Sequence, residues 1–247
     1  MPGYASYGAG VGNFGLNMAQ APDTTQREVL GSIIQASDPV WGGLEFIYAR
    51  ASATIRQYGF VVLTATWDAT LGGFRLDAAE APTTANIGRP LAVSTFAMTS
   101  GQYGWFAISG NVPVNCSASL AAGSTFGTGA VVGGQGAGNS AGKQVLNAVI
   151  SVTASQTIAK NNCQAPSGST SLQVPNSDGW FPGVYLSGTG IAAGTTVSAI
   201  SPDGRTITLS ASTTAVVSGT VTATYNNGTV FYNVATINRP FVQGAIT

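Results

Sequence analysis

The chain has 247 residues, a formal net charge of zero and a charged fraction of only 7%. Its nine basic residues are scattered singly along the sequence, which argues against a nucleic-acid partner because such partners select basic patches. A hydrophobic content of 44% argues against a disordered chain, while so little surface charge favours association with other subunits. No apolar run approaches the ~20 residues of a membrane-spanning helix, and the N-terminal sequence lacks signal-peptide features, so we expect no membrane association.

Residues 1–26 are rich in Gly, Ala and Asn and contain too few apolar residues to fold by themselves. Tyr4, Tyr7 and Phe14 are spaced through this segment. We expect an extended N-terminal arm whose aromatic side chains dock on a neighbouring subunit; a disordered terminus is the alternative. The sequence from Asp23 to Leu30 is the best candidate for a single helical turn.

From residue 27 the sequence breaks into short β-rich runs separated by Gly and Pro. Two of them are FVVLTATW at 60–67 and YGWFAISGNVPVNC at 103–116. GGFRLDAAEAP at 72–82 reads as a turn, a short strand and a solvated loop that carries Asp77 and Glu80. No window of 10–12 residues shows a helical period. Many short strands with frequent turns predict an all-β domain over 27–160, either a β-barrel or a sandwich.

The composition changes near Asn161, and shorter, more regular alternation follows. Apolar and polar residues alternate at 197–199, 207–209 and 221–225, and SPDGR at 201–205 has the composition of a tight turn. We expect a small second β domain over 161–226. The turn at 226–228 leads into residues 227–247, which resemble the first domain in composition. We expect them to complete it as a closing strand, which would make the second domain an insertion.

The chemistry available to this chain is restricted because it contains no histidine, the commonest general base and metal ligand. GNSAG at 138–142 matches the nucleophile elbow around Ser140, but that motif needs a histidine base and a strand-to-helix turn. Cys116 and Cys163 have no metal-type spacing, and we expect free thiols. We therefore expect no catalytic residues, no metal and no cofactor. A glycosidase with paired carboxylates remains open, although no pair of acidic residues points to one.

Tyr103 and Trp105 lie two residues apart and therefore on one face of an expected strand. Gly101 and Gly104 flank them and permit a tight turn or a close backbone approach. We expect this aromatic pair in the core at one end of the barrel. An exposed aromatic platform for a ligand is the alternative.

Three segments of the chain resemble the decoration, or cement, proteins of tailed-bacteriophage heads. They are LGSIIQASDPVWGGLEFIYARA at 30–51, SGQYGWFAISGNVPVNCSASLAAGSTF at 100–126 and GKQVLNAVI at 142–150. In that family a Gly-Gln-x-Gly-Trp segment begins a barrel strand, and an alanine-rich stretch leads to a hairpin. Residues 183–213 are similar to small β modules that recur in phage head and tail proteins.

The resemblance implies a virion structural protein on the outer surface of the capsid, without enzymatic activity. It would bridge subunits of the major capsid protein, with copies of itself associated as a dimer or trimer. As aromatic anchors we expect Tyr4, Tyr7, Phe14 and Trp41, with Arg27 and Arg50 at the rim of the contact.

The alternative function is that of a phage tail or fibre protein with a glycan-binding β domain. Trp180, Phe181 and Tyr185 would then form a stacking platform for the glycan. Packing in the core of the second domain is the other interpretation of these three side chains.

Overall fold

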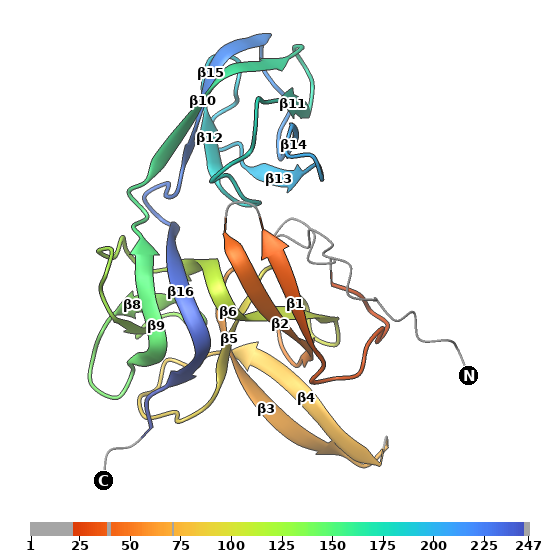
Figure 1. Ribbon diagram of the computed structural model, residues 1–247, viewed down its shortest axis with the longest axis vertical. Coiled ribbons are helices and arrows are strands. Elements are labelled where there is room, and N and C mark those ends of the chain that lie inside the picture. Colours follow the sequence, from red (N-terminus) through yellow and green to blue (C-terminus); the bar gives the residue numbers. More distant parts are fainter. Residues whose placement is uncertain (1–21, 39–40, 71, 245–247) are drawn as a thin grey trace.

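The computed structural model describes residues 22–38, 41–70 and 72–244. These residues form two β-sheets and contain no helix, so the predicted all-β class is confirmed. Figure 1 shows two lobes arranged along the long axis of the molecule, a larger body and a smaller second lobe.

Ten strands form the sheet of the body. They are β1 (Ile33–Asp38), β2 (Gly42–Ala51), β3 (Phe60–Asp68), β4 (Gly73–Glu80), β5 (Leu91–Ser94), β6 (Tyr103–Cys116), β7 (Phe126–Thr128), β8 (Gly136–Gly138), β9 (Val145–Val152) and β16 (Phe231–Val242).

Five of these strands close into a small barrel. β2 pairs with β4 in parallel, β4 with β3, β3 with β5, β5 with β6, and β6 pairs back with β2. The interior of so small a barrel is narrow, and alanines supply much of its lining. The buried interior side chains are Ala49, Ala51, Ile55, Val61, Ala78, Ala92, Met98, Phe106 and Ile108.

A second and larger core lies outside the barrel. β6 is 14 residues long, and its second half leaves the barrel to pair with β16, which in turn pairs with β9. Apolar residues on the outer face of the barrel, among them Phe46, Phe60 and Val93, pack in this core with residues of β16 and of the second lobe. The barrel strands are therefore apolar on both faces.

Six strands form the sheet of the second lobe. They are β10 (Thr157–Ala165), β11 (Ser171–Gln173), β12 (Tyr185–Ser187), β13 (Val197–Ile200), β14 (Thr206–Leu209) and β15 (Val217–Thr224), in the order β12-β15-β10-β11-β14-β13. Backbone bonds also join the two outermost strands, from Leu186 N–H to Thr195 O (2.8 Å) and from Val197 N–H to Val184 O (3.0 Å). The second lobe is therefore a small closed barrel as well.

The second lobe is inserted between two neighbouring strands of the body. β9 and β16 pair with each other, yet β10 to β15 lie between them in the sequence. The chain enters and leaves the lobe on paired strands, with Thr157 opposite Thr224. The second sheet begins at Thr157, so the expected boundary at residue 161 falls inside β10.

Candidate interaction surface

The β3–β4 hairpin extends beyond the barrel. Its register runs from the Val61–Glu80 pair to the Asp68–Gly73 pair, whereas β4 contacts β2 in register only at Asp77 and Ala78. The outer half of the hairpin is thus a two-stranded ribbon, and it projects at the end of the molecule opposite the second lobe (Figure 1).

One face of the projecting ribbon carries an exposed aromatic pair. Trp67 and Phe74 are direct cross-strand partners, and their ring centroids lie 5.3 Å apart in an edge-to-face arrangement. The two side chains are 58% and 75% exposed, and no other aromatic residue within the described ranges is classed as exposed. Leu63 and Leu76, on the same face, pack partly against the barrel core. The apolar lining of the barrel therefore continues outward into this pair.

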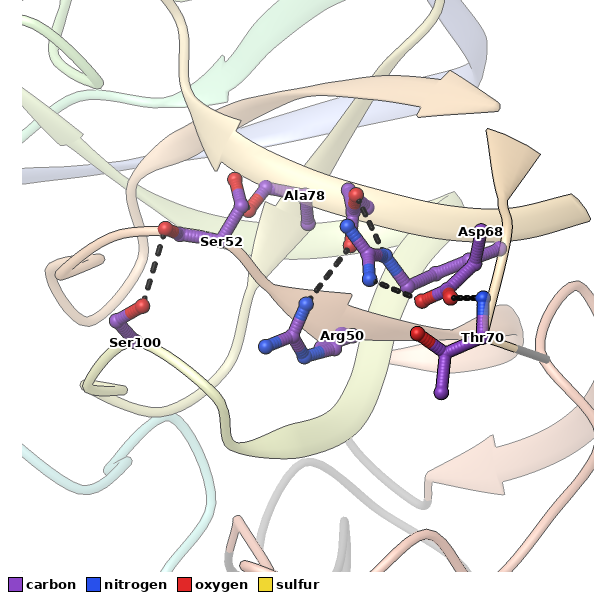
Figure 2. Close-up of polar contacts among 8 residues, drawn as sticks. Arg50, Ser52, Asp68, Thr70, Ala78 and Ser100 are labelled. Atoms are coloured by element: carbon purple, nitrogen blue, oxygen red, sulfur yellow. Dashed lines mark hydrogen bonds and ion pairs between the residues drawn. The ribbon is translucent and has the colours of Figure 1, made fainter. Parts of the chain in front are cut away.

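The opposite face of the ribbon is held by ion pairs. Arg75 donates through Nη1 to Asp68 Oδ2 (2.5 Å) and through Nε to Asp77 Oδ2 (2.9 Å), and Arg50 Nη1 lies 3.8 Å from Asp77 Oδ1. Figure 2 shows this network, together with the N–H of Thr70 donating to Asp68 Oδ1. The hydrogen bond to Asp77, aided by the charges of both aspartates, raises the pKa of Arg75. Two positive and two negative groups thus neutralise each other on this side.

This network changes the interpretation of two acidic residues. Asp77 and Glu80, expected in a solvated loop, belong to strand β4, which is longer than the short strand expected there, because pairing with both β3 and β2 provides its hydrogen bonds. Asp77 is buried, and Glu80 forms a two-bond ion pair with Arg56 (2.8 and 3.1 Å). Three residues apart on one strand, the two carboxylates point to opposite faces and do not form a catalytic pair.

Arg50 and Arg27, the expected rim residues, both form ion pairs within the chain. Arg50 belongs to the network above, with 28% of its side chain exposed. Arg27 is 64% exposed and pairs with Asp23 at 2.6 Å. Asp23 also accepts the N–H of Thr25 (3.0 Å), and these local bonds replace the helical turn expected from Asp23 to Leu30.

The described end of the N-terminal arm lies on the chain's own barrel. Asp23 and Tyr103 exchange two backbone hydrogen bonds (3.0 and 2.8 Å), and the N–H of Arg27 donates to the hydroxyl of Tyr48 (3.0 Å). The expected arm residues Tyr4, Tyr7 and Phe14 lie outside the described residues.

Tyr103 and Trp105 lie outside the barrel, which corrects their expected place in its core. The ring of Tyr48 lies 6.4 Å from that of Tyr103 and 5.0 Å from that of Trp105, and both partners are only half-buried. Because side chains alternate along a strand, Phe106 points into the barrel instead. A Cβ at Gly104 would lie 3.1 Å from Met98 Cε, so this glycine makes room for the methionine that closes the barrel end.

A buried aromatic cluster joins the two lobes. Phe181 is completely buried, and its ring lies 6.0 Å from Trp41, 5.5 Å from Tyr58, 5.0 Å from Tyr225 and 5.8 Å from Tyr232. The hydroxyl of Tyr58, in the body, donates to Pro182 O in the second lobe (2.9 Å). Burial raises the pKa of all three tyrosines, that of Tyr232 to about 12. We call these five residues the Phe181 cluster.

Burial of these aromatic residues overturns one expectation, for Trp41, and confirms core packing over the glycan platform for Trp180 and Phe181. Trp41, expected as an exposed anchor, is only 9% exposed. Trp180 and Phe181, expected in the alternative glycan platform, are 2% and 0% exposed, and Trp180 Nε1 donates to Ile158 O (3.1 Å). Tyr185 is half-buried and stacks on Tyr232 at 6.4 Å. Burial where the lobes meet removes the exposed rings that a glycan would stack on.

The two cysteines and Ser140 form no reactive site in the structure. Cys116 and Cys163 are both free and buried. Burial raises the pKa of the Cys116 thiol to about 12 and also raises that of Cys163, so both resist ionisation. Ser140 lies exposed in the turn between β8 and β9.

The described part of the chain offers neither a cluster of metal-ligating residues nor a membrane-spanning helix. It contains no group of three or more Cys, Asp or Glu residues arranged to hold a metal ion. Within the same ranges, no helix is long and apolar enough to cross a membrane.

Comparison with known proteins gave no match to a family model, to a curated protein or to a solved structure.

Proposed function

We propose that this chain is a bacteriophage capsid decoration protein. It binds the outer surface of the phage head and bridges neighbouring major capsid subunits, without catalytic activity or a cofactor. The proposal starts from the resemblance of residues 30–51, 100–126 and 142–150 to that family, and from a sequence with almost no charge.

The observation that carries the proposal is that the two ends of the molecule differ. The projecting β3–β4 hairpin lies at one end and the inserted lobe at the other (Figure 1). Exposed aromatic side chains gathered on one element are typical of interaction sites, which makes the hairpin end the docking end. The second lobe then stands away from the shell.

The Phe181 cluster holds the two lobes of the molecule together. Its ring contacts join the second lobe to the body directly, in addition to the two chain segments that connect them. A contact made at the hairpin therefore fixes the position of the whole molecule on the shell.

Stabilisation of the shell follows from mass action. A partner that binds the assembled shell, and not its separated subunits, lowers the free energy of the assembled state and leaves that of the separated subunits unchanged. Weak contacts become strong when neighbouring sites are bridged, because each later contact forms at high effective concentration. Association of the chain as a dimer or trimer, at symmetry positions of the lattice, would provide such bridging.

The test is binding of the purified chain to expanded, empty heads that lack it, measured as saturating copies per head. We expect saturation at hundreds of copies and a higher temperature of head disruption. No binding, or saturation at about a dozen vertex-like sites, would refute the proposal.

A variant lacking residues 2–21 tests the arm in the same assay. This deletion leaves Asp23 and its bonds to the barrel in place. Binding as tight as that of the full chain would exclude Tyr4, Tyr7 and Phe14 as anchors.

A further inference from the structure

We infer that the Trp67–Phe74 face of the hairpin is the capsid contact, and that it fits an uncharged, apolar hollow between assembled shell subunits. This inference rests on the proposed function and specifies the chemistry of its partner. The shell contact would thus come from side chains that the sequence did not single out.

The first argument is the way in which the ribbon presents the two rings. Beyond Asp77 and Ala78 no described strand lies beside β4 in register on its outer side, and the described residues leave Trp67 and Phe74 58% and 75% exposed. The ion pairs of Arg75 with Asp68 and Asp77 tie the opposite face together. The rings therefore stand on a braced ribbon, and less backbone entropy has to be lost on docking than from an unbraced loop.

The second argument is charge. The charged residues of the hairpin are Asp68, Arg75, Asp77 and Glu80, and each forms an ion pair inside the chain. No unpaired charge of the hairpin is left to attract an oppositely charged partner. A neutral, apolar hollow on the shell is the complement of such a face. A charged shell surface would find no opposite charge on the hairpin and would lose its hydration on contact.

The third argument is the exposed area of the two rings, which favours the shell lattice over a second free copy of the chain as the binding partner. With roughly 200 Å² for each ring, the exposed parts of Trp67 and Phe74 (58% and 75%) offer roughly 270 Å². A stable contact between two free proteins needs about 800 Å² on each partner. The pair is too small for that contact alone and suits a site that is repeated across a shell and strengthened by bridging.

The experiment compares two double variants in the head-binding assay. Trp67→Thr with Phe74→Thr removes both rings and keeps residues of high strand propensity. Val131→Thr with Val132→Thr is the matched control, since it removes two exposed apolar side chains (89% and 38%) from the loop between β7 and β8. Thermal melts of both variants establish folding, and Phe74→Thr alone is used if the double change unfolds the hairpin.

We expect the ring variant to bind heads roughly 100-fold more weakly than the wild type, as for the loss of interface hot spots. The control should bind like the wild type. Wild-type affinity should change less than about threefold between about 50 mM and about 500 mM salt, because apolar contacts are not screened.

The outcomes separate this inference from the proposed function. If the folded ring variant binds heads like the wild type, the hairpin is not the contact, although the decoration proposal stands. If the wild-type chain does not bind heads, the proposed function itself fails. A steep fall of affinity with salt would contradict the claim that the hollow on the shell is uncharged. If the wild-type chain is a dimer and the ring variant is a monomer, the Trp67–Phe74 face binds a second copy of the chain and not the shell.

Discussion

Truncation of Phe181 is the sharpest test of how the two lobes are joined. Its ring is completely buried and lies within 6.0 Å of four other rings, measured between centroids. Phe→Ala in a protein core costs about 3–5 kcal/mol, and each aromatic pair adds about 0.5–1.5 kcal/mol beyond burial. Because these ring contacts are not independent, we expect Phe181→Ala to lower the free energy of unfolding by about 5 kcal/mol.

Thermal and urea unfolding, followed by circular dichroism, measure this loss. At about 2–4 °C for each kcal/mol in a chain of this size, Tm should fall by about 10–20 °C. Phe74→Ala is the matched control: the chemical change is the same, but the ring is 75% exposed and has one ring partner, Trp67, so we expect a cost of only about 0.5–1.5 kcal/mol. Equal destabilisation by the two substitutions would refute the role of the Phe181 cluster.

Two further predictions concern buried polar groups. Asn233 is completely buried; it accepts the N–H groups of Leu120 (3.0 Å) and Ala154 (2.9 Å) and donates to Ala118 O (3.0 Å). Asn233→Leu leaves three backbone groups without their partner and should cost about 3–5 kcal/mol in urea unfolding; a cost under about 1 kcal/mol would contradict this. Burial raises the pKa of Tyr232 from its ordinary value near 10 to about 12, so its contribution to stability is complete below pH 10 and is lost as the pH rises towards 12. Tyrosinate absorbance measured alongside circular dichroism tests this, and ionisation of every tyrosine near pH 10 in the folded chain would count against it.

The all-β class was predictable because short β-rich runs and turn residues are local signals. The direction of each side chain was not, as Trp105 and Phe106 illustrate. Both faces of β6 are apolar, since one lines the barrel and the other meets the outer core. Without a polar face, alternation does not tell which residue points inward.

For Trp180 and Phe181 the sequence left both core packing and an exposed platform open, for a different reason. Trp180 and Phe181 stand between Gly179 and Pro182, a context typical of exposed loops. Their burial depends on Tyr58 and Tyr232, which are distant in sequence and reach them only when the lobes pack together.

The exposed pair on the hairpin was missed although its local signal exists. Leu63, Trp67, Phe74 and Leu76 fall on one face by simple alternation. Whether that face is covered depends on how far the β3–β4 ribbon outruns its neighbour β2, and this is a property of the closed barrel. Strand β4 was also underestimated, because alanine and acidic residues are poor strand formers and pairing on both sides compensates.

Because the second lobe is inserted between two paired strands of the body, another domain could replace it. Its entry and exit strands are hydrogen-bonded neighbours, with Thr157 facing Thr224, so a foreign domain whose ends lie about 5 Å apart would meet the same geometry. Domain insertions are tolerated best where few host contacts are disturbed, and here the host strands β9 and β16 pair directly with each other. The graft must bring an aromatic ring to the place of Phe181, because Tyr58 and Tyr232 remain behind in the body as its socket.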